Sequence, residues 1–284
     1  MCAVKIVVDS TADISRELRE RLGIEMVPLK VHFGEEQFLD GVTIDPDDFY
    51  DKLASSPALP TTSQPSPIEF QEAYERILKE TPDAQIISYH LSAKFSGTYQ
   101  SATIGRTMLE SDADITVIDS KSASCGFGLI AIRAAELAKE GRSKAEILAE
   151  IDRLSRDLKL YFLVDTLEYL QRGGRIGKAA ALFGSILNIK PILTIDREGT
   201  VAPVDKVRGS KKAMQRIVEL LEPNFGSDPV NVAIAWSKYD AAAKELLEMV
   251  RSRFNVQDVH ETTLGAVIGT HVGPGTAAVF MYRV

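Results

Sequence analysis

Short apolar runs alternate with segments of helical periodicity through the first 160 residues, and this alternation limits the folds open to the chain. Apolar runs of strand length occupy residues 5–9, 85–89 and 115–119. Each is followed by a stretch whose apolar residues have the spacing of a helix face. Continuous apolar runs fit strands that are buried on both faces, and strands that alternate with helices indicate parallel βαβ units. We therefore predict a doubly wound parallel sheet in residues 1–160.

The pattern changes after about residue 160. Expected strands lie at residues 161–164, 192–195, 201–204, 232–236, 256–263 and 277–282, with helices near 179–187, 211–221 and 241–254. This irregular order favours a mixed sheet. A length of 284 residues also favours two domains over one. We expect an α/β protein with domains at residues 1–160 and 161–284.

Charge and composition argue against several classes of function. The formal net charge is −7, whereas nucleic-acid binding requires cations that neutralise phosphates, so we expect no nucleic-acid partner. No basic amphipathic segment favours a membrane surface, and no apolar run reaches the roughly 20 residues of a membrane span, so we expect at most transient membrane contact. Two cysteines, and no apolar export segment after the first residue, favour the cytoplasm.

A hydroxyl-rich loop follows an expected hairpin. Residues 26–40 predict the hairpin, with Gly34 near its turn, and residues 57–67 predict an ordered loop. Ser66 is expected to cap the next helix, with Glu69 completing a capping box.

Capping leaves the hydroxyls of Thr61, Thr62 and Ser63 unexplained. Hydroxyls grouped beside the start of a helix can bind an oxyanion, and they can equally satisfy the loop backbone. The pattern alone leaves both interpretations open.

Ser96 and Gly97 have a more informative position. They follow the strand at residues 85–89 and open the next helix, where ligands collect beyond the carboxyl ends of parallel strands. A helix N-terminus offers free N–H groups and partial positive charge to an anion, and Gly97 allows close approach to the backbone. The alternative is that Ser96 only caps the helix.

A Gly-Gly turn is flanked by two arginines. Asp165 and Glu168 predict a capping box at the start of a short helix, and Gly173 suits the left-handed position that ends it. Arg172 and Arg175 beside this turn are either solvated surface residues or a clamp for a phosphate or for a partner's carboxylates.

His271 lies in a Gly/Pro-rich turn before the last strand. A single histidine is more often structural than catalytic, although near an anion it could donate a hydrogen bond. The sequence has no G-x-S-x-G or H-E-x-x-H motif and no complete P-loop. Its histidines and cysteines lack the spacing of metal ligands, so we expect no metal site.

Together these motifs resemble the DegV family. The matching segments run in the family's order over nearly the whole chain: Asp9–Asp13, Thr61–Ser66, Ser96–Ser101, Asp165–Ile176, Asn188–Ile192 and His271–Gly275. Each segment alone is a weak signal, but the combination is highly specific.

The resemblance implies a Rossmann-like N-terminal domain and a C-terminal domain with a mixed, partly barrel-like sheet. It also implies a long-chain fatty acid between the domains as the bound ligand, with no cofactor. Residues implied to surround the carboxylate are Thr62, Ser96 and the amide of Gly97, with Thr61, Ser63 and His271 close by.

The resemblance further implies a partner rather than a catalytic residue in this chain. Arg172 and Arg175 match arginines of a contact surface for a dihydroxyacetone-kinase-like, ATP-binding subunit. That subunit would convert the bound acid to an acyl phosphate for phospholipid synthesis. Gln171, where a basic residue is common, and Phe95, where Leu is usual, depart from the family pattern.

The physical chemistry fits such a ligand. A long acyl chain buries about 14–16 CH₂ groups at roughly 0.8 kcal/mol each, whereas a hydrogen bond adds about 1 kcal/mol net. The tail should therefore set affinity and the hydroxyls orientation. Neutral donors, with no buried Lys or Arg, would avoid the desolvation cost of an ion pair. Two alternatives are a fatty-acid carrier or sensor without a kinase, and a stand-alone enzyme that uses Ser96 with His271.

Overall fold

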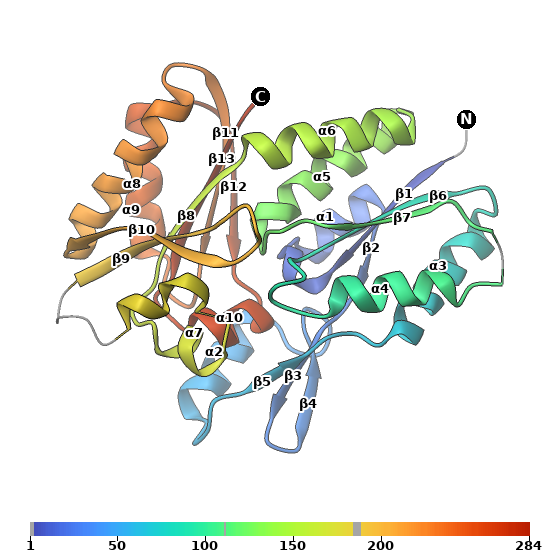
Figure 1. The fold of residues 1–284 in the computed structure, drawn as a ribbon, viewed down its shortest axis with the longest axis horizontal. Helices are drawn as coiled ribbons and strands as arrows, with labels where there is room; N and C mark the ends of the chain where they lie inside the picture. Colours follow the sequence, from blue (N-terminus) through green and yellow to red (C-terminus); the bar gives the residue numbers. More distant parts are fainter. Residues whose placement is uncertain (1–2, 111, 184–188) are drawn as a thin grey trace.

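The computed structural model describes residues 3–110, 112–183 and 189–284. These residues form two lobes, each built on its own β-sheet, and the two sheets lie side by side in Figure 1. A small third sheet lies at the lower edge of the molecule in the same view. The chain is thus an α/β protein with a parallel sheet followed by a mixed sheet, as the sequence predicts.

A parallel sheet in the order β2–β1–β6–β7 forms the centre of the N-terminal lobe. Its strands are β1 (Val4–Asp9), β2 (Ile24–Val27), β6 (Gln85–His90) and β7 (Ile115–Asp119). The helices of this lobe are η1 (Ser10–Ala12), α1 (Arg16–Leu22), α3 (Pro67–Glu80), α4 (Thr98–Thr107), α5 (Cys125–Lys139) and α6 (Lys144–Asp157).

Helices cover both faces of this parallel sheet. Val8 packs in one cluster with Phe127 of α5, together with residues of α6. The neighbouring Val7 points to the opposite face, where it packs with Phe70 of α3 and Ala102 of α4. Burial on both faces explains why these strands are continuous apolar runs in the sequence.

The third sheet is antiparallel, in the order β4–β3–β5. It consists of β3 (Lys30–Phe33), β4 (Glu36–Leu39) and β5 (Thr61–Ser63), and α2 (Pro46–Ser55) lies between β4 and β5 in the chain. The expected hairpin is present as β3 and β4, with Gly34 in the left-handed region at φ 60°. The expected loop at residues 57–67 instead contains a strand, because β5 pairs with β3, and α2 was not predicted.

The C-terminal lobe has a mixed six-stranded sheet in the order β10–β9–β8–β13–β11–β12, in which only β11 and β12 pair in parallel. Its strands are β8 (Lys159–Leu163), β9 (Ile189–Ile195), β10 (Val201–Arg208), β11 (Pro229–Trp236), β12 (Asn255–Thr263) and β13 (Ala277–Arg283). The helices are α7 (Glu168–Arg172), η2 (Gly177–Leu182), α8 (Ser210–Phe225), α9 (Ala241–Arg253) and α10 (Ala266–Val272).

The two faces of the mixed sheet have different neighbours. Helices α8 and α9 cover one face, where Ile217 and Leu246 pack with Val232. The other face turns toward the N-terminal lobe, and Phe280 of β13 packs there in a cluster that includes Leu129 of α5. The second face therefore contributes to the contact between the lobes.

Two predictions for the C-terminal half need correction. The helix expected near residues 179–187 is a 3₁₀ segment, η2, and residues 184–188 lie outside the described residues. The expected turn around His271 contains the short helix α10, and His271 lies in its last turn.

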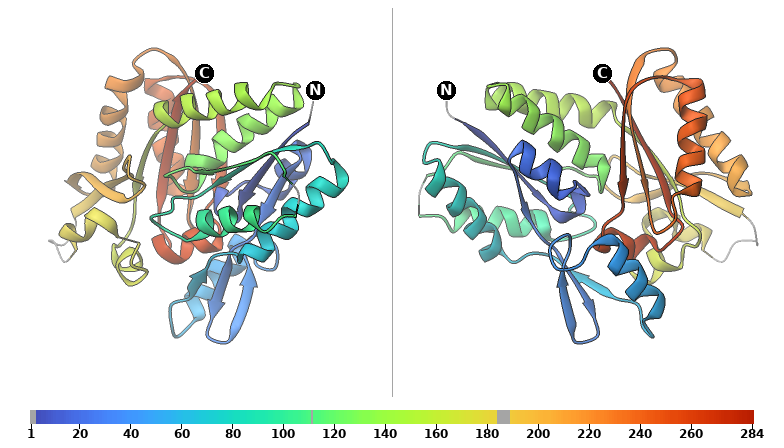
Figure 2. Two further views of the ribbon diagram at one scale, coloured as in Figure 1. Left: turned by 45° about the vertical axis from the view of Figure 1, so that its right-hand side comes forward. Right: turned by 180° about the vertical axis from the view of Figure 1, so that it is seen from behind.

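The small sheet and α2 belong to the N-terminal segment by sequence, but they pack against the C-terminal lobe. Phe49 and Tyr50 of α2 share a cluster with Ala266 and Val267 of α10. The Tyr50 hydroxyl also donates a hydrogen bond to the carbonyl of Leu264 at 3.1 Å. The small sheet and α2 thus connect the two lobes beside α10 (Figure 2).

Candidate functional site

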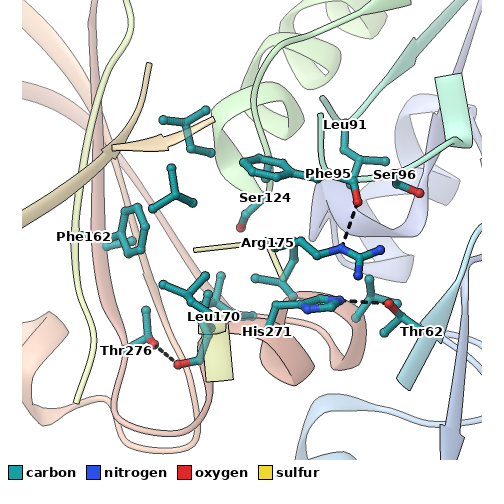
Figure 3. Close-up of a pocket in the computed structure, with 18 of the residues that line it drawn as sticks. Thr62, Leu91, Phe95, Ser96, Ser124, Phe162, Leu170, Arg175, His271 and Thr276 are labelled. Atoms are coloured by element: carbon teal, nitrogen blue, oxygen red, sulfur yellow. Dashed lines mark hydrogen bonds between the residues drawn. The ribbon is translucent and has the colours of Figure 1, made fainter. Parts of the chain in front are cut away.

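A cavity of about 330 Å³ lies between the lobes, beyond the carboxyl ends of the parallel strands (Figure 3). This is the expected place for a ligand in an open parallel sheet. Its volume falls at the lower end of the range for small-molecule sites. Both lobes contribute to its wall, and most of the lining side chains are apolar.

The apolar part of the cavity is formed mainly by aliphatic and aromatic side chains. They are Leu29, Leu91 and Phe95 from the N-terminal lobe and Leu160, Phe162, Leu170, Ile195, Val201, Leu264, Val267, Ile268, Val272, Ala278 and Phe280 from the C-terminal lobe. Two polar residues of the wall are already bonded elsewhere. Ser124 donates to Asp13 at 2.5 Å, and the Thr276 hydroxyl donates to backbone carbonyls.

The remaining polar residues of the wall form what we call the polar end: Thr62, Ser63, Gln64, Ser96, Arg175 and His271. Thr62, Ser96, Arg175 and His271 lie on the same side of the cavity in Figure 3, away from Phe162. The cavity thus has one polar end and a larger apolar lining, the division that an amphipathic molecule requires.

Thr62 and His271 meet across the two lobes. Strand β5 places Thr62 opposite Val31 of β3, and α10 carries His271. The Thr62 Oγ1 and His271 Nε2 atoms are 2.9 Å apart, a hydrogen bond whose direction depends on the imidazole tautomer. Burial, and secondarily Arg175, lowers the pKa of His271 to about 4. The imidazole is therefore neutral at pH 7.

Arg175 lies in the cavity wall beside His271 (Figure 3). Its Nε donates to the carbonyl of Phe95 at 3.1 Å, and its Nη1 donates to the carbonyl of Gly173 at 2.7 Å. Arg175 adds a partly buried cation to the cavity wall, which the expectation of neutral donors with no buried Lys or Arg does not include. The backbone carbonyls solvate one side of the guanidinium and reduce the cost of its partial burial.

Arg172 is placed differently. Its side chain is exposed at the end of α7 and pairs with Glu168. It does not line the cavity. The two arginines of the Gly-Gly turn therefore face different surroundings, one the surface and one the polar end.

Ser96 lines the cavity, but the other expected parts of its loop do not contribute as predicted. The Ser96 and Thr98 hydroxyl oxygens are 2.9 Å apart. The amide of Gly97 donates to the side chain of Gln64 at 3.0 Å, and Gly97 is not part of the cavity wall. The Gly97 amide is thus already bonded to Gln64, and Gln64 is a cavity residue that the sequence analysis did not identify.

The other two loop hydroxyls also differ. Ser63 lines the cavity, and its Oγ is 2.9 Å from His32 Nε2. Thr61 is exposed and lies outside the cavity wall. Only Thr62 of the three directs its hydroxyl to His271.

The capping predictions have mixed outcomes. Ser66 and Glu69 form the predicted capping box of α3. The box at α7 is wrong, because the Glu168 amide bonds to Thr166 and the carboxylate of Asp165 pairs with Lys190. The left-handed conformation predicted for Gly173 is also wrong, because its φ is −72°. The next residue, Gly174, has the left-handed conformation instead, with a φ of 66°.

Hydrogen bonding gives little support to a serine–histidine nucleophile at the cavity. Within the described residues, Ser96 Oγ pairs with Thr98 and His271 pairs with Thr62, so the two are not joined. No side chain orients His271 through Nδ1, which has no hydrogen-bond partner in the described chain.

A second group of residues has the order of a catalytic triad. Ser88 Oγ is 2.6 Å from His90 Nε2, and His90 Nδ1 is 3.1 Å from Asp9 Oδ2. All three side chains are fully buried, and Ser88 also bonds the Tyr74 hydroxyl at 2.7 Å. A buried network whose groups are bonded to each other stabilises the core and leaves no space for a substrate.

Two further searches give negative results for the described residues. No three histidine, cysteine or acidic side chains lie where they could hold a metal ion together. No helix in residues 3–110, 112–183 and 189–284 is both long and apolar enough to cross a membrane.

Comparisons with known proteins agree on one family. A family model described as "Uncharacterised protein, DegV family" matches residues 3–284. Protein DegV of Bacillus subtilis is 37% identical over 278 residues, which cover 97% of this chain and 98% of the relative.

Solved structures are also similar over almost their whole length. A DegV family protein from Thermus thermophilus, described by its fatty acid binding, has a TM-score of 0.92 and 39% identity, with 99% of this chain and 100% of that chain covered. A stearic acid-binding protein from Eubacterium ventriosum has a TM-score of 0.89 and 27% identity, with 99% and 98% covered.

Proposed function

Because this chain belongs to the DegV family, we propose that it binds a long-chain fatty acid in the cavity between its lobes. We further propose that the protein presents the bound carboxylate to a separate ATP-dependent kinase subunit in the cytoplasm. The carboxylate oxygen would attack the γ-phosphorus of ATP, and ADP would leave as the acyl phosphate forms. This chain itself would bind and orient the acid.

The observation that carries the proposal is the division of the cavity into an apolar part and a polar end. An acyl tail gains roughly 0.8 kcal/mol for each CH₂ group that it buries. The polar lining residues Ser124 and Thr276 are bonded within the protein, so the apolar part offers a tail little competition from unpaired polar groups.

The polar end suits a carboxylate in composition. Thr62 and Ser96 offer hydroxyl donors, and Arg175 offers a positive charge. Arg175 has N–H groups beyond the two that bond Phe95 and Gly173, so it can still bind an anion. A charged hydrogen bond of this kind is worth about 1.5–3 kcal/mol.

The kinase step requires that a phosphate donor reach the polar end from the surface of the protein. Gln64, which lines this end, is exposed. Arg172 is also exposed, at the end of α7 and directly before the two glycines of the Gly-Gly turn. A phosphate donor could therefore reach the carboxylate from the side of Gln64. Arg172 remains our candidate for partner contact, while Arg175 is better explained as a ligand-binding residue.

The first test is mass spectrometry of an organic extract of the purified protein. We expect about one long-chain fatty acid per chain, and less in a Leu170→Asp variant, which places a charge in the apolar part. Empty wild-type protein that also fails to take up added palmitate or stearate would contradict fatty-acid binding.

A second test separates the kinase proposal from a carrier or sensor. The loaded protein is mixed with ATP, Mg²⁺ and a dihydroxyacetone-kinase-like subunit from the same genome, and acyl phosphate is trapped with hydroxylamine. Acyl hydroxamate that depends on both proteins supports the kinase role. Its absence with every such subunit would leave a carrier or sensor.

A further inference from the structure

Helices α7 and α10 fit together through two glycines. A Cβ atom added to Gly173, just after α7, would lie 2.3 Å from His271 Nδ1. A Cβ atom added to Gly273, just after α10, would lie 2.2 Å from Cδ2 of Tyr169. Each helix thus ends in a glycine against which a side chain of the other helix packs.

The absence of a side chain at Gly173 is explained by this contact and not by backbone conformation. Its φ is −72°, which any residue adopts. The next residue, Gly174, has the left-handed φ of 66° and no atom within 4 Å of an added Cβ. One glycine of the turn is therefore required by space and the other by conformation.

Packing also replaces hydrogen bonding at one edge of the His271 ring. Nδ1 is buried and has no hydrogen-bond partner in the described residues, while Nε2 contacts Thr62. The orientation in which Nε2 points at Thr62 is therefore not fixed by a hydrogen bond at Nδ1 within the described residues. The backbone of Gly173 occupies the Nδ1 side.

Gly173 also holds the neighbouring cation. Its carbonyl accepts a hydrogen bond from Arg175 Nη1 at 2.7 Å, and its amide donates to the Tyr169 carbonyl at 2.9 Å. One residue therefore contacts the imidazole of His271 and the guanidinium of Arg175.

We propose that Gly173 is a positioning residue for the polar end, which sets the imidazole of His271 against Thr62 and the guanidinium of Arg175 beside it. Its effect on a fatty acid rests on the function proposed above. Its effect on His271 does not, because that contact exists within the protein alone.

The first experiment compares Gly173→Ala with Gly174→Ala in the unliganded protein, with the histidine rings followed by ¹⁵N NMR during a pH titration. An alanine methyl at 173 must displace the imidazole, because it would also lie 3.1 Å from the Tyr169 carbonyl and cannot turn away. We expect the pKa of His271 to rise toward its ordinary value of 6.5 in Gly173→Ala only. Gly174→Ala should lower the melting temperature and leave this pKa unchanged, since its cost is conformational.

The second experiment measures release of palmitate and of hexadecanol, an analogue without the carboxylate. Gly173→Ala should disturb the polar end and so cost the carboxylate of palmitate one charge-assisted hydrogen bond. Loss of one such bond is expected to speed palmitate release about tenfold. Hexadecanol release should change less than twofold. In a His271→Ala background, where the imidazole is gone, Gly173→Ala should add little to the rate.

The outcomes distinguish the two proposals. A His271 titration that is identical in wild type and in folded Gly173→Ala would overturn the positioning role, whatever the ligand. An altered His271 titration with unchanged palmitate release would overturn the positioning role as well. In that case the position of the His271 ring would have no effect on the bound fatty acid. Failure of every variant and of wild type to bind palmitate would instead contradict the proposed function, while the titration still tests the contact.

Discussion

At the scale of single residues, the polar end combines neutral donors with one cation. Thr62 and the neutral His271 are joined by a hydrogen bond, and Arg175 lies beside them. Two carbonyls already bond Arg175, so its charge is held in place before a ligand arrives. A fixed, partly desolvated cation orients a carboxylate more strongly than hydroxyls alone.

Arg175→Ala and Arg172→Ala should therefore separate ligand binding from partner contact. Arg175→Ala is expected to weaken palmitate affinity about tenfold or more, since it removes a charged hydrogen-bond donor. Arg172→Ala should leave affinity within twofold, because its side chain is exposed and outside the cavity wall. Displacement of a fluorescent fatty acid measures both, and equal affinity for Arg175→Ala and wild type would refute the role of Arg175.

The titration of His271 gives a pH prediction at the same scale. Its folded pKa of about 4 lies below the ordinary 6.5, so the unfolded chain binds a proton that the folded protein rejects. The contribution of this residue to stability is full above about pH 6.5 and is lost as pH falls toward 4. His271→Gln should reduce the slope of the unfolding free energy in this window. Urea unfolding at pH 4.5 and 7 measures the slope, and an unchanged slope would contradict the assignment.

At the scale of elements, α10 joins the small sheet, the N-terminal lobe and the cavity. Two buried aspartic acid side chains hold its first residues: Asp13 accepts from the amide of Gly265 at 2.9 Å, and Asp40 accepts from the amide of Ala266 at 2.9 Å. The same helix carries Val267, Ile268 and His271 into the cavity wall. The contacts between the lobes thus determine where the wall lies.

Asp13 makes this connection sensitive to pH between about 4 and 8. Burial, with a smaller effect of Asp40, raises its pKa from 3.8 to about 8. The folded protein binds this proton more tightly than the unfolded chain, so the unfolding free energy falls as pH rises from about 4 to about 8. Asp13→Asn keeps the acceptor for Gly265 without the charge, and it should raise the unfolding free energy at pH 9 by a few kcal/mol. Chemical unfolding of both proteins at pH 5 and 9 tests this, and a variant that is no more stable than wild type at pH 9 would contradict it.

The hairpin of β9 and β10 covers the apolar part. Ile195 and Val201 line the cavity, and the carbonyl of Gly199 between them accepts from Ser92 of the N-terminal lobe at 2.8 Å. Ser92→Ala removes this contact, whose acceptor Gly199 lies between the two hairpin residues that line the apolar part. We expect palmitate and hexadecanol to be released faster by the same factor. Stopped-flow release measures the ratio, and a change confined to palmitate would contradict this role of the hairpin.

At the scale of the whole molecule, the sequence predicts the sheets well and the connections between them poorly. Three strands of the parallel sheet, β1, β6 and β7, are recognisable as short apolar runs. Strand β2 is missed, because it contains Glu25 and its end overlaps the hairpin expected at residues 26–40. Strand β5 and helix α10 are not recognisable, because both depend on distant contacts: β5 pairs with β3, and α10 packs on α2. The α10 sequence, with β-branched residues and an internal glycine, has little helix propensity of its own.

The same limit applies to the site. Ser96 could be identified from its position after a strand, and Thr62 and His271 from the resemblance of their motifs to the DegV family; all three line the polar end. The Gly97 amide could not be excluded, because its bond to Gln64 joins residues 33 positions apart. The direction of Arg175 also depends on the backbone of the Gly-Gly turn, which the spacing of two arginines does not reveal.

Because both lobes form the cavity wall, a bound fatty acid should stabilise them together. A ligand present at 100 times its Kd adds about 2.7 kcal/mol to the unfolding free energy. Differential scanning calorimetry should therefore show a higher melting temperature with palmitate. The methyl ester of palmitate, which lacks the carboxylate charge, should raise it less, and an equal shift with both ligands would argue against the polar end.

The orientation of the acid between the lobes is tested most directly by a crystal structure with a fatty acid that carries bromine on its last carbon. The anomalous signal of bromine locates the tail, and the electron density locates the carboxylate. We predict bromine in the apolar part, near Phe162 and Phe280, and a carboxylate within hydrogen-bond distance of Thr62 and Arg175. Bromine at the polar end, or a ligand outside the space between the lobes, would contradict the account.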